Sequence, residues 1–339
     1  MMSLPAPTAV RRDGARPRPA LHAAILGTGS FAPDGVITNA DLEALVATSD
    51  AWIVQRTGIR ERRRAGPGIT SALMAAEAGR RALGQAGVDR VDAIVVATCT
   101  PDNPIPSTAC LVQARLGLVG IPAFDINAAC SGFVYGLSIA QSLIASRAIG
   151  SMLLIGVDRV TSIVDFTDRT TCVLFGDAAG ATVIGGVADG GVSALAWGAD
   201  GRESDLIHYG PKPGEPGSKP GVRMAGKGTY RLAVERICEV TAQLCADAGW
   251  SIEDVDLVIP HQANLRIIEA AMQRLHIPME RVVVNVERYG NTSAASIPLA
   301  LAEAHAAGRL RDGDRIVAAA FGSGVTWGGV ALRWIAPTR

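Results

Sequence analysis

The chain has 339 residues, which is long enough for two ordinary domains or for one large duplicated fold. Its 32 lysine and arginine residues balance 32 aspartate and glutamate residues, which excludes a global electrostatic field for holding nucleic acid or an anionic membrane. Hydrophobic residues make up 48% of the chain and charged residues 19%. This composition excludes a disordered chain and indicates tightly packed layers of small side chains.

Six cysteines are present without a CxxC pair and without metal-ligand spacing to histidine. Nothing in the sequence resembles a secretory signal. We therefore expect free thiols, no metal site and a reducing, cytoplasmic location.

Along the chain, residues 1–20 combine prolines with arginines and show no apolar periodicity, so we expect a disordered leader outside the fold. Beyond it, short β-branched runs alternate with longer helical patterns, which is typical of α/β architecture. Alternating prolines and glycines predict a loop at 210–221. Helices are predicted at 39–47, 71–86, 130–146, 229–248, 264–275 and 293–307, and strands at 93–97, 123–127, 152–157, 255–259, 282–286 and 315–320.

The chain also contains an internal repeat. Gln85-Ala86-Gly87 and the strand after it parallel Asp247-Ala248-Gly249 and the strand after that, at an offset of roughly 160 residues. The similarity continues through a turn, an apolar helix and a further strand. We interpret it as duplication of one α/β unit, with an N-terminal half at 21–190 and a C-terminal half at 191–339. Two unrelated α/β units are the alternative.

The two central helices, at 130–146 and 293–307, have no polar stripe and must therefore be covered on nearly all sides. The uncharged run 126–146 contains too many polar side chains for a membrane span, and we interpret it as a buried helix. Two sheets with these helices between them would form a five-layered α-β-α-β-α sandwich.

Cys130 follows a predicted strand and begins an apolar helix, with small residues on both sides. Such a turn presents a nucleophile, and the N–H groups of a helix start should lower the pKa of the thiol below about 8.5. A buried structural cysteine is the alternative.

His261 and Asn291 also follow predicted strands. Taken alone, His261 would be interpreted as a structural histidine and Asn291 as a helix cap. Together, the three side chains can hold a thioester and stabilise an enolate.

The segments that contain these residues resemble β-ketoacyl-[acyl carrier protein] synthase III, the initiating condensing enzyme of type II fatty acid synthesis within the thiolase fold. The resemblance spans about residues 21–335 and is carried by the segments 48–59, 125–133, 175–181, 260–266, 288–298 and 321–328.

The resemblance implies that Cys130 takes an acyl group from acyl-coenzyme A. Malonyl-acyl carrier protein then loses carbon dioxide, and its enolate attacks the acyl-Cys, while His261 and Asn291 hydrogen-bond the malonyl thioester oxygen. The backbone N–H groups of Cys130 and Ser323 would face the acyl oxygen. Ser323 stands where the family more often has glycine, and it would be strained if that position needs a positive φ.

By the same resemblance, Trp52 and Arg169 would stack on the adenine of coenzyme A, Arg56 would contact phosphate and Asn264 would approach the pantetheine arm. Without it, Trp52 would be interpreted as a core-edge indole and Arg169 as a surface charge. Acyl-coenzyme A is a substrate, and no cofactor is expected.

Arg266 and Arg231 match the docking surface for the acidic carrier protein, where a local cationic patch suits a transient partner. The neighbouring run Arg62-Arg63-Arg64 is expected on a solvated face. Ile105 matches the wall of the acyl pocket, which the family contributes across a homodimer interface. The primer itself stays open.

Four other functions are alternatives. A priming ketosynthase or acyltransferase of a polyketide or secondary-metabolite pathway would share Cys, His and Asn. A biosynthetic thiolase is disfavoured, because the segment 321–324 has no second cysteine to act as base. A non-catalytic scaffold is disfavoured by the complete Cys-His-Asn set, and a cysteine hydrolase is conceivable from Cys130 and His261.

Overall fold

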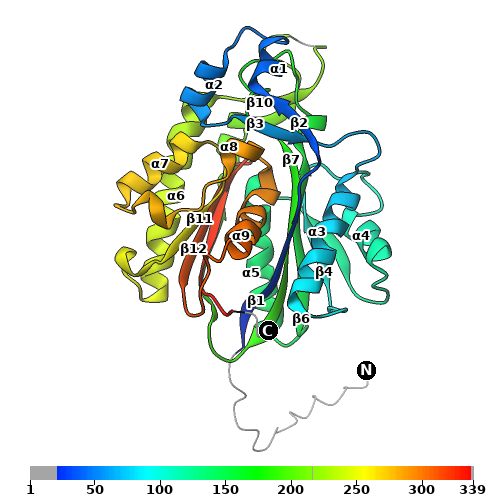
Figure 1. The fold of residues 1–339 in the computed structure, drawn as a ribbon, viewed down its shortest axis with the longest axis vertical. Helices are drawn as coiled ribbons and strands as arrows, with labels where there is room; N and C mark the ends of the chain where they lie inside the picture. Colours follow the sequence, from blue (N-terminus) through cyan, green and yellow to red (C-terminus); the bar gives the residue numbers. More distant parts are fainter. Residues whose placement is uncertain (1–20, 216, 337–339) are drawn as a thin grey trace, which may run out of the picture.

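The computed structural model describes residues 21–215 and 217–336, so the leader expected at 1–20 lies outside the described residues. The first sheet has five strands in the order β1-β7-β6-β4-β5. β4 pairs in parallel with β5 and β6, whereas β7 is antiparallel to β6 and β1. Two helices cover its outer face (Figure 1). The bounds are β1 (His22–Phe31), β4 (Ile94–Ala97), β5 (Ala123–Ile126), β6 (Ser151–Arg159), β7 (Asp177–Val187), α3 (Ser71–Ala86) and α4 (Thr108–Leu116).

The second sheet has four strands in the order β11-β12-β13-β8. β11 and β12 are parallel and the remaining pairs are antiparallel. Its outer face is covered by α6 and α7 (Figure 1). All its strands follow residue 190, whereas those of the first sheet precede it. The bounds are β8 (Gly191–Ala199), β11 (Leu257–Pro260), β12 (Arg315–Gly322), β13 (Thr326–Arg333), α6 (Gly226–Ala248) and α7 (Leu265–Arg274).

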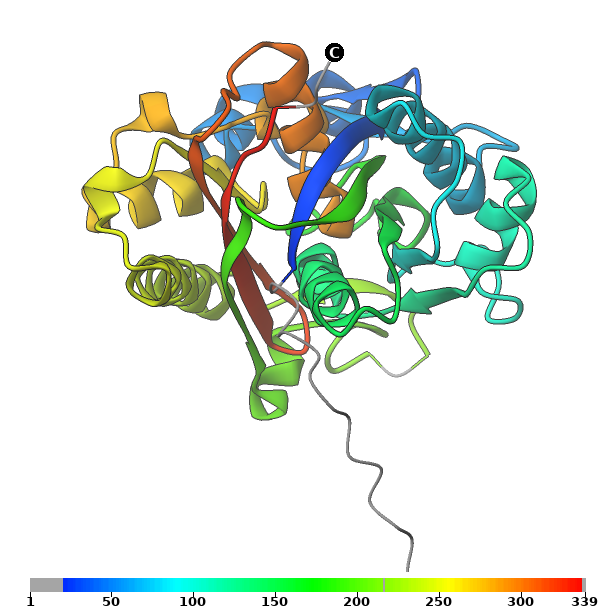
Figure 2. The same ribbon diagram turned by 90° about the horizontal axis from the view of Figure 1, so that it is seen from below.

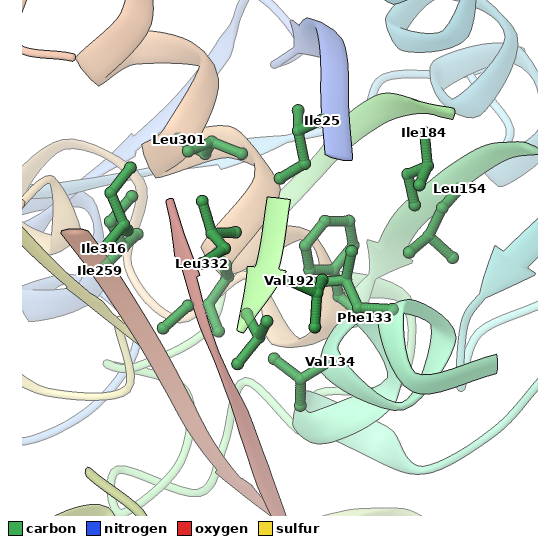
Figure 3. Packing of buried hydrophobic residues seen from close by; sticks show 14 of the residues in the cluster. Ile25, Phe133, Val134, Leu154, Ile184, Val192, Ile259, Leu301, Ile316 and Leu332 are labelled. Carbon is green, nitrogen blue, oxygen red and sulfur yellow. The ribbon is translucent and has the colours of Figure 1, made fainter. Parts of the chain in front are cut away.

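Two apolar helices, α5 (Gly132–Ala145) and α9 (Ser296–Ala306), lie between the sheets (Figure 2). Phe133 and Val134 of α5 point into the same apolar layer as Leu301 of α9 and Leu332 of β13 (Figure 3). The predicted five-layered thiolase-like sandwich is therefore confirmed, and the absence of a polar stripe on these helices has the expected cause. Among the described residues, no helix has both the length and the apolar character needed to cross a membrane.

Short elements cap the end of the sandwich where the parallel strands finish. These are β2 (Gly35–Thr38), α1 (Asn39–Glu43), α2 (Asp50–Thr57), β3 (Glu61–Arg64), β9 (Ile207–Gly210), β10 (Gly221–Met224) and α8 (Val286–Tyr289), with the 3₁₀ turns η1 (Ala129–Ser131), η2 (Val160–Ser162), η3 (Gly201–Leu206) and η6 (Ser293–Ala295). Two further 3₁₀ turns, η4 (Ile252–Asp254) and η5 (Met279–Arg281), lie near the start of β11.

The internal repeat has matching contacts in the two halves. The carboxylate of Asp92 accepts a hydrogen bond from the N–H of Ser151, and that of Asp256 accepts one from Arg315; each pair is separated by 59 residues. Two turns match as well. The side chain of Asn127 accepts from the N–H of Ala129 before α5, and the side chain of Asn291 accepts from the N–H of Ser293 before α9. These contacts support the duplication.

Two predictions are wrong. The strand predicted at 282–286 is reduced to one bridge between Val258 and Val282, because the N–H of Asn285 donates to the side chain of Gln262 and the chain turns into α8. Arg62 is not on a solvated face but fully buried, where its guanidinium donates to the carbonyls of Ile37 and Val173. Burial lowers the pKa of Arg62 to about 10.

The two halves approach each other closely at Gly156 of β6. A Cβ built on this glycine would lie 2.1 Å from the carbonyl oxygen of Ala294, which is backbone and cannot move aside alone. We therefore expect Gly156→Ala to lower the free energy of unfolding by about 3 kcal/mol or more, as overpacking does at a rigid contact. Urea unfolding measures the effect.

The control for this prediction is Gly84→Ala in α3, where an added Cβ meets nothing within 4 Å. A helical alanine there should stabilise the chain by roughly 0.5–1 kcal/mol. Equal unfolding midpoints for the two variants would contradict the proposed contact between the halves.

Candidate active site

A cavity of about 730 Å³ opens where β11 ends and α5 begins. It is lined by residues from both halves of the chain, and most of the lining is apolar. Seven of the residues singled out from the sequence line it, and they are Trp52, Arg56, Cys130, His261, Asn264, Arg266 and Asn291. The fold therefore brings the thiol of Cys130, the imidazole of His261 and the amide of Asn291 into one space.

Cys130 lies in η1, directly before α5, as the sequence predicted. Its neighbour Ala129 has φ of +45°, an uncommon conformation for a residue with a Cβ. The predicted lowering of the thiol pKa is wrong. Burial, together with the nearby carboxylate of Asp158, raises the pKa of Cys130 to about 12. Desolvation outweighs the field of the short helix start, so the resting group is a neutral thiol.

His261 follows β11 and is 1% exposed. Its backbone N–H donates to the carbonyl of Ala319 at 2.8 Å, which ties the residue to β12. Burial lowers the pKa of the imidazole to about 4, so it is neutral at neutral pH and keeps one ring N–H. Within the described part of the chain, Nδ1 is buried without a hydrogen-bond partner.

Asn291 is held on all sides by backbone contacts. Its N–H donates to the carbonyl of Leu174 at 2.8 Å, its carbonyl accepts from Gly176 at 3.1 Å, and its side-chain Oδ1 accepts from the N–H of Ser293 at 2.9 Å. Since Oδ1 is committed as an acceptor, the NH₂ group is the part of this amide that can donate to a ligand.

The end of β12 and the turn that follows it pack directly against Cys130. A Cβ on Gly322 would lie 2.9 Å from the backbone nitrogen of Cys130, and Thr326 ties the turn to the carbonyl of Ala128 at 2.9 Å. Ser323 is not among the described residues with positive φ, whereas Gly324 has φ of +124°. The serine therefore escapes the strain considered from the sequence, and its hydroxyl donates to the carbonyl of Ile207.

The residues expected to bind coenzyme A are only partly in the cavity. Arg169 lies outside its lining, and the guanidinium carbon is 4.9 Å from the centroid of the Trp52 ring. At that separation the two groups stack on each other, so a base bound between them requires the arginine to move. Asn264 caps α7: Oδ1 accepts from the N–H of Arg266, and Nδ2 donates to the carbonyl of Arg56.

Arg266 and Arg231 are both exposed, and the guanidinium of Arg266 lies over the ring of Tyr230 at 5.6 Å. Ile105 is 87% exposed and does not line the cavity, so one chain by itself does not place it in an acyl pocket. Among residues 21–215 and 217–336, no group of three or more His, Cys, Asp or Glu side chains could hold a metal ion.

Sequence reasoning missed a second group of lining residues around β9, β10 and the start of α6. These are Ile207, Met224, Lys227, Thr229 and Tyr230. The loop predicted at 210–221 lies between Ile207 and the other four residues. The short stretches of chain on both sides of this loop were the available signal.

Comparison with known proteins places this arrangement in context. Residues 124–201 match the model of the family 3-oxoacyl-[acyl-carrier-protein (ACP)] synthase III, and residues 245–334 match that of its C-terminal part. A β-ketoacyl-[acyl-carrier-protein] synthase III of Roseiflexus sp. (strain RS-1) is 48% identical over 327 residues, covering 93% of this chain and 99% of the relative.

Solved structures agree with this similarity. A 3-oxoacyl-[acyl-carrier-protein] synthase III from Aquifex aeolicus VF5 superposes with a TM-score of 0.88 at 47% identity, covering 92% of this chain and 100% of that one. The priming β-ketosynthase from the R1128 polyketide biosynthetic pathway superposes with a TM-score of 0.89 at 35% identity, covering 96% and 100%.

The buried imidazole predicts a pH dependence of stability. Because the pKa of His261 is lowered to about 4 from 6.5, the unfolded chain binds this proton more tightly than the folded chain. The contribution of His261 to stability is therefore complete above pH 6.5 and is lost as the pH falls towards 4. We expect the free energy of unfolding to fall by up to about 3 kcal/mol over this window. This loss should be absent in His261→Gln.

Urea unfolding at pH 7 and pH 4.5 measures this loss. The matched control is His276→Asn, which removes an exposed imidazole and should keep the full dependence of the unmodified protein. A His261→Gln variant as acid-sensitive as the unmodified protein would exclude a neutral buried imidazole.

Proposed function

This chain belongs to the 3-oxoacyl-[acyl-carrier-protein] synthase III family and catalyses the condensation that initiates fatty acid synthesis, and we propose that it does so through an acyl thioester on Cys130. The observation that carries the proposal is the single cavity that collects Cys130, His261 and Asn291. Its substrates are an acyl-coenzyme A primer and malonyl-acyl carrier protein.

In the first half-reaction, the sulfur of Cys130 attacks the thioester carbon of acyl-coenzyme A. The new S–C bond forms as the bond to coenzyme A breaks, and the proton of the Cys130 thiol ends on the departing thiol. The backbone N–H groups of Cys130 and Ser323 stabilise the oxyanion of the tetrahedral intermediate. The contact between Gly322 and the nitrogen of Cys130 supports this assignment, since it brings the turn next to the nucleophile.

In the second half-reaction, malonyl-acyl carrier protein loses carbon dioxide, and the electrons of the broken C–C bond form an enolate. The enolate carbon attacks the acyl-Cys, which releases β-ketoacyl-acyl carrier protein and the Cys130 thiolate. His261 and Asn291 donate hydrogen bonds to the thioester oxygen where negative charge develops. A neutral imidazole suits this role, because it has an N–H to donate without a charge to desolvate.

The entrance of the cavity supports recognition of two carriers. Arg56, Lys227 and Arg266 line it and are exposed, which suits the phosphates of coenzyme A and an acidic carrier protein. In this proposal Trp52 and Arg169 bind adenine, Arg56 contacts phosphate, and Asn264 borders the pantetheine arm. Arg266 and Arg231 meet the carrier protein. The reaction needs no cofactor.

The exposure of Ile105 supports a homodimer in which this side chain enters the acyl pocket of the partner subunit. β5 is an edge strand of the first sheet and carries the exposed Phe124, so a second copy has an apolar edge to cover. We also propose a cytoplasmic location, because all six cysteines are free thiols.

A priming ketosynthase of a polyketide pathway is the second candidate, favoured by the 35% identity to the R1128 enzyme. Both reactions use the same three side chains. Competition between acetyl-, isobutyryl- and longer acyl-coenzyme A, followed by extension on fatty acid and polyketide carrier proteins, separates the two functions.

Incubation with acetyl-coenzyme A should add one acetyl group to Cys130, which intact-protein and peptide mass spectrometry detects. Cys130→Ala should abolish the adduct, because no other thiol lines the cavity among the described residues. Cys110→Ala removes an exposed thiol on α4 and should keep the adduct. An adduct that persists in Cys130→Ala would refute the assignment, and rapid transfer of the acyl group to water would favour a hydrolase.

His261→Ala and Asn291→Ala should separate the two half-reactions. Each removes one donor to the enolate oxygen, so malonyl decarboxylation should fall about a hundred- to a thousandfold. Acylation of Cys130 should fall much less, since neither donor faces the acyl-Cys oxygen in this mechanism. Rapid quench with labelled acetyl-coenzyme A and labelled malonyl-acyl carrier protein measures the two rates. Equal losses in both would contradict this division of roles.

A further inference from the structure

The direction of the Asn291 amide depends on the turn that follows it. Oδ1 of Asn291 accepts from the N–H of Ser293 at 2.9 Å, which leaves the NH₂ group as the part that can donate into the cavity. Ser293 has φ of +52°, a conformation that a residue with a Cβ keeps only where surrounding contacts impose it. The orientation of the amide therefore depends on the contacts that hold this turn, η6, in place.

A buried carboxylate from the other half of the chain holds η6. Oδ2 of Asp158 accepts from the N–H of Ala294, the residue after Ser293, at 3.1 Å. Asp158 is fully buried near the end of β6 and does not line the cavity. Gly156, two residues earlier on the same strand, lies against the carbonyl oxygen of Ala294. β6 therefore contacts η6 both through a hydrogen bond and through a close backbone contact.

The other carboxylate oxygen of Asp158 binds its own half of the chain. Oδ1 accepts from the hydroxyl of Thr98 at 3.1 Å, from the N–H of Cys99 at 2.8 Å, and from the N–H and the hydroxyl of Thr100 at 3.1 and 2.8 Å. These four donors satisfy Oδ1 and fix the carboxylate in position. Oδ2 is thereby directed at η6.

The duplication shows what Asp158 adds to this turn. At the spacing that relates the two turn asparagines, Gly322 matches Asp158. By the same spacing, Cys130 matches Ala294. A Cβ on Gly322 would lie 2.9 Å from the nitrogen of Cys130, so this position carries no side-chain acceptor. One turn offers its N–H to substrate in the proposed mechanism, whereas the other gives the matching N–H to a carboxylate of the opposite half.

We propose that Asp158 is a positioning residue for condensation: by binding the N–H of Ala294, it keeps η6 in the form that directs the Asn291 NH₂ group to the enolate oxygen. Without this hydrogen bond, the backbone at Ser293 can relax from its positive φ, and its N–H then no longer holds the amide oxygen. Asp158 itself does not touch the substrate. The inference rests on the proposed function in taking Asn291 as a donor to the enolate.

Asp158→Asn tests this role, because it changes one side of the contact. The amide oxygen should take the place of Oδ1, where four donors converge, so the NH₂ group faces the N–H of Ala294, donor against donor. We expect kcat for malonyl decarboxylation to fall about tenfold or more, since a displaced donor loses most of its effect. KM for malonyl-acyl carrier protein and the rate of Cys130 acylation should change little. Release of labelled carbon dioxide and rapid quench with labelled acetyl-coenzyme A measure these quantities.

The Asn291→Ala background provides a sharper readout. Because the amide that Asp158 positions is then gone, Asp158→Asn should cause little further loss of decarboxylation in the double variant. A role in stability alone would lower the rate by the same factor in both backgrounds.

Asp102→Asn is the matched control. The Asp102 carboxylate accepts from the backbone N–H groups of Ser71 at 2.7 Å and Ala72 at 2.9 Å, within the N-terminal half and outside the cavity lining. This change should lower the urea midpoint and leave the ratio of decarboxylation to acylation unchanged.

Thr98→Val carries the test if Asp158→Asn fails to fold. It removes one donor to Oδ1 and keeps the carboxylate, so the ratio of decarboxylation to acylation should fall in the same direction, by about threefold. In whichever variant folds, losses that are equal in the two rates, or absent, would overturn the inference. If the unmodified protein becomes acylated but releases no carbon dioxide from malonyl-acyl carrier protein, the proposed function fails instead.

Discussion

The buried carboxylate of Asp158 is the contact on which the arrangement of the site depends. It lies at the end of β6 and accepts hydrogen bonds from Thr98, Cys99 and Thr100 of the N-terminal half and from Ala294 of the C-terminal half. A buried charge is tolerated only when its oxygen atoms are fully hydrogen-bonded. Asp158 therefore holds η6 next to η1. In doing so it also fixes the distance between the two halves.

The same contact has an electrostatic cost for catalysis. Burial and the carboxylate of Asp158 act in the same direction and raise the pKa of Cys130 to about 12, so the resting cavity holds a neutral thiol and a neutral imidazole. A site of this kind stabilises charge only through oriented donors, which in the proposed mechanism are backbone N–H groups, the imidazole N–H of His261 and the amide of Asn291. Such donors need no reorganisation when charge develops, and their contribution is larger where water is excluded.

Much of the fold was predictable, because it depends on local patterns. The helix at 71–86 has the predicted bounds, and the apolar helices at 130–146 and 293–307 were correctly expected to be buried. The strand predicted at 282–286 was wrong, because its pairing depends on a distant side chain: Gln262 accepts a hydrogen bond from the N–H of Asn285. Arg62 was misplaced for a similar reason: its acceptors are carbonyls distant in sequence.

The sequence alone determined the fold class and the family, and it predicted the duplication and the reactive residues, because residue type, periodicity and motif are properties of neighbours along the chain. Only the tertiary structure decided the direction in which burial shifts the pKa values of Cys130 and His261, the direct stacking of Arg169 on Trp52 and the burial of Arg62. Desolvation and hydrogen bonding depend on which atoms surround a group. For this site, those atoms come from segments of both halves that meet only after folding.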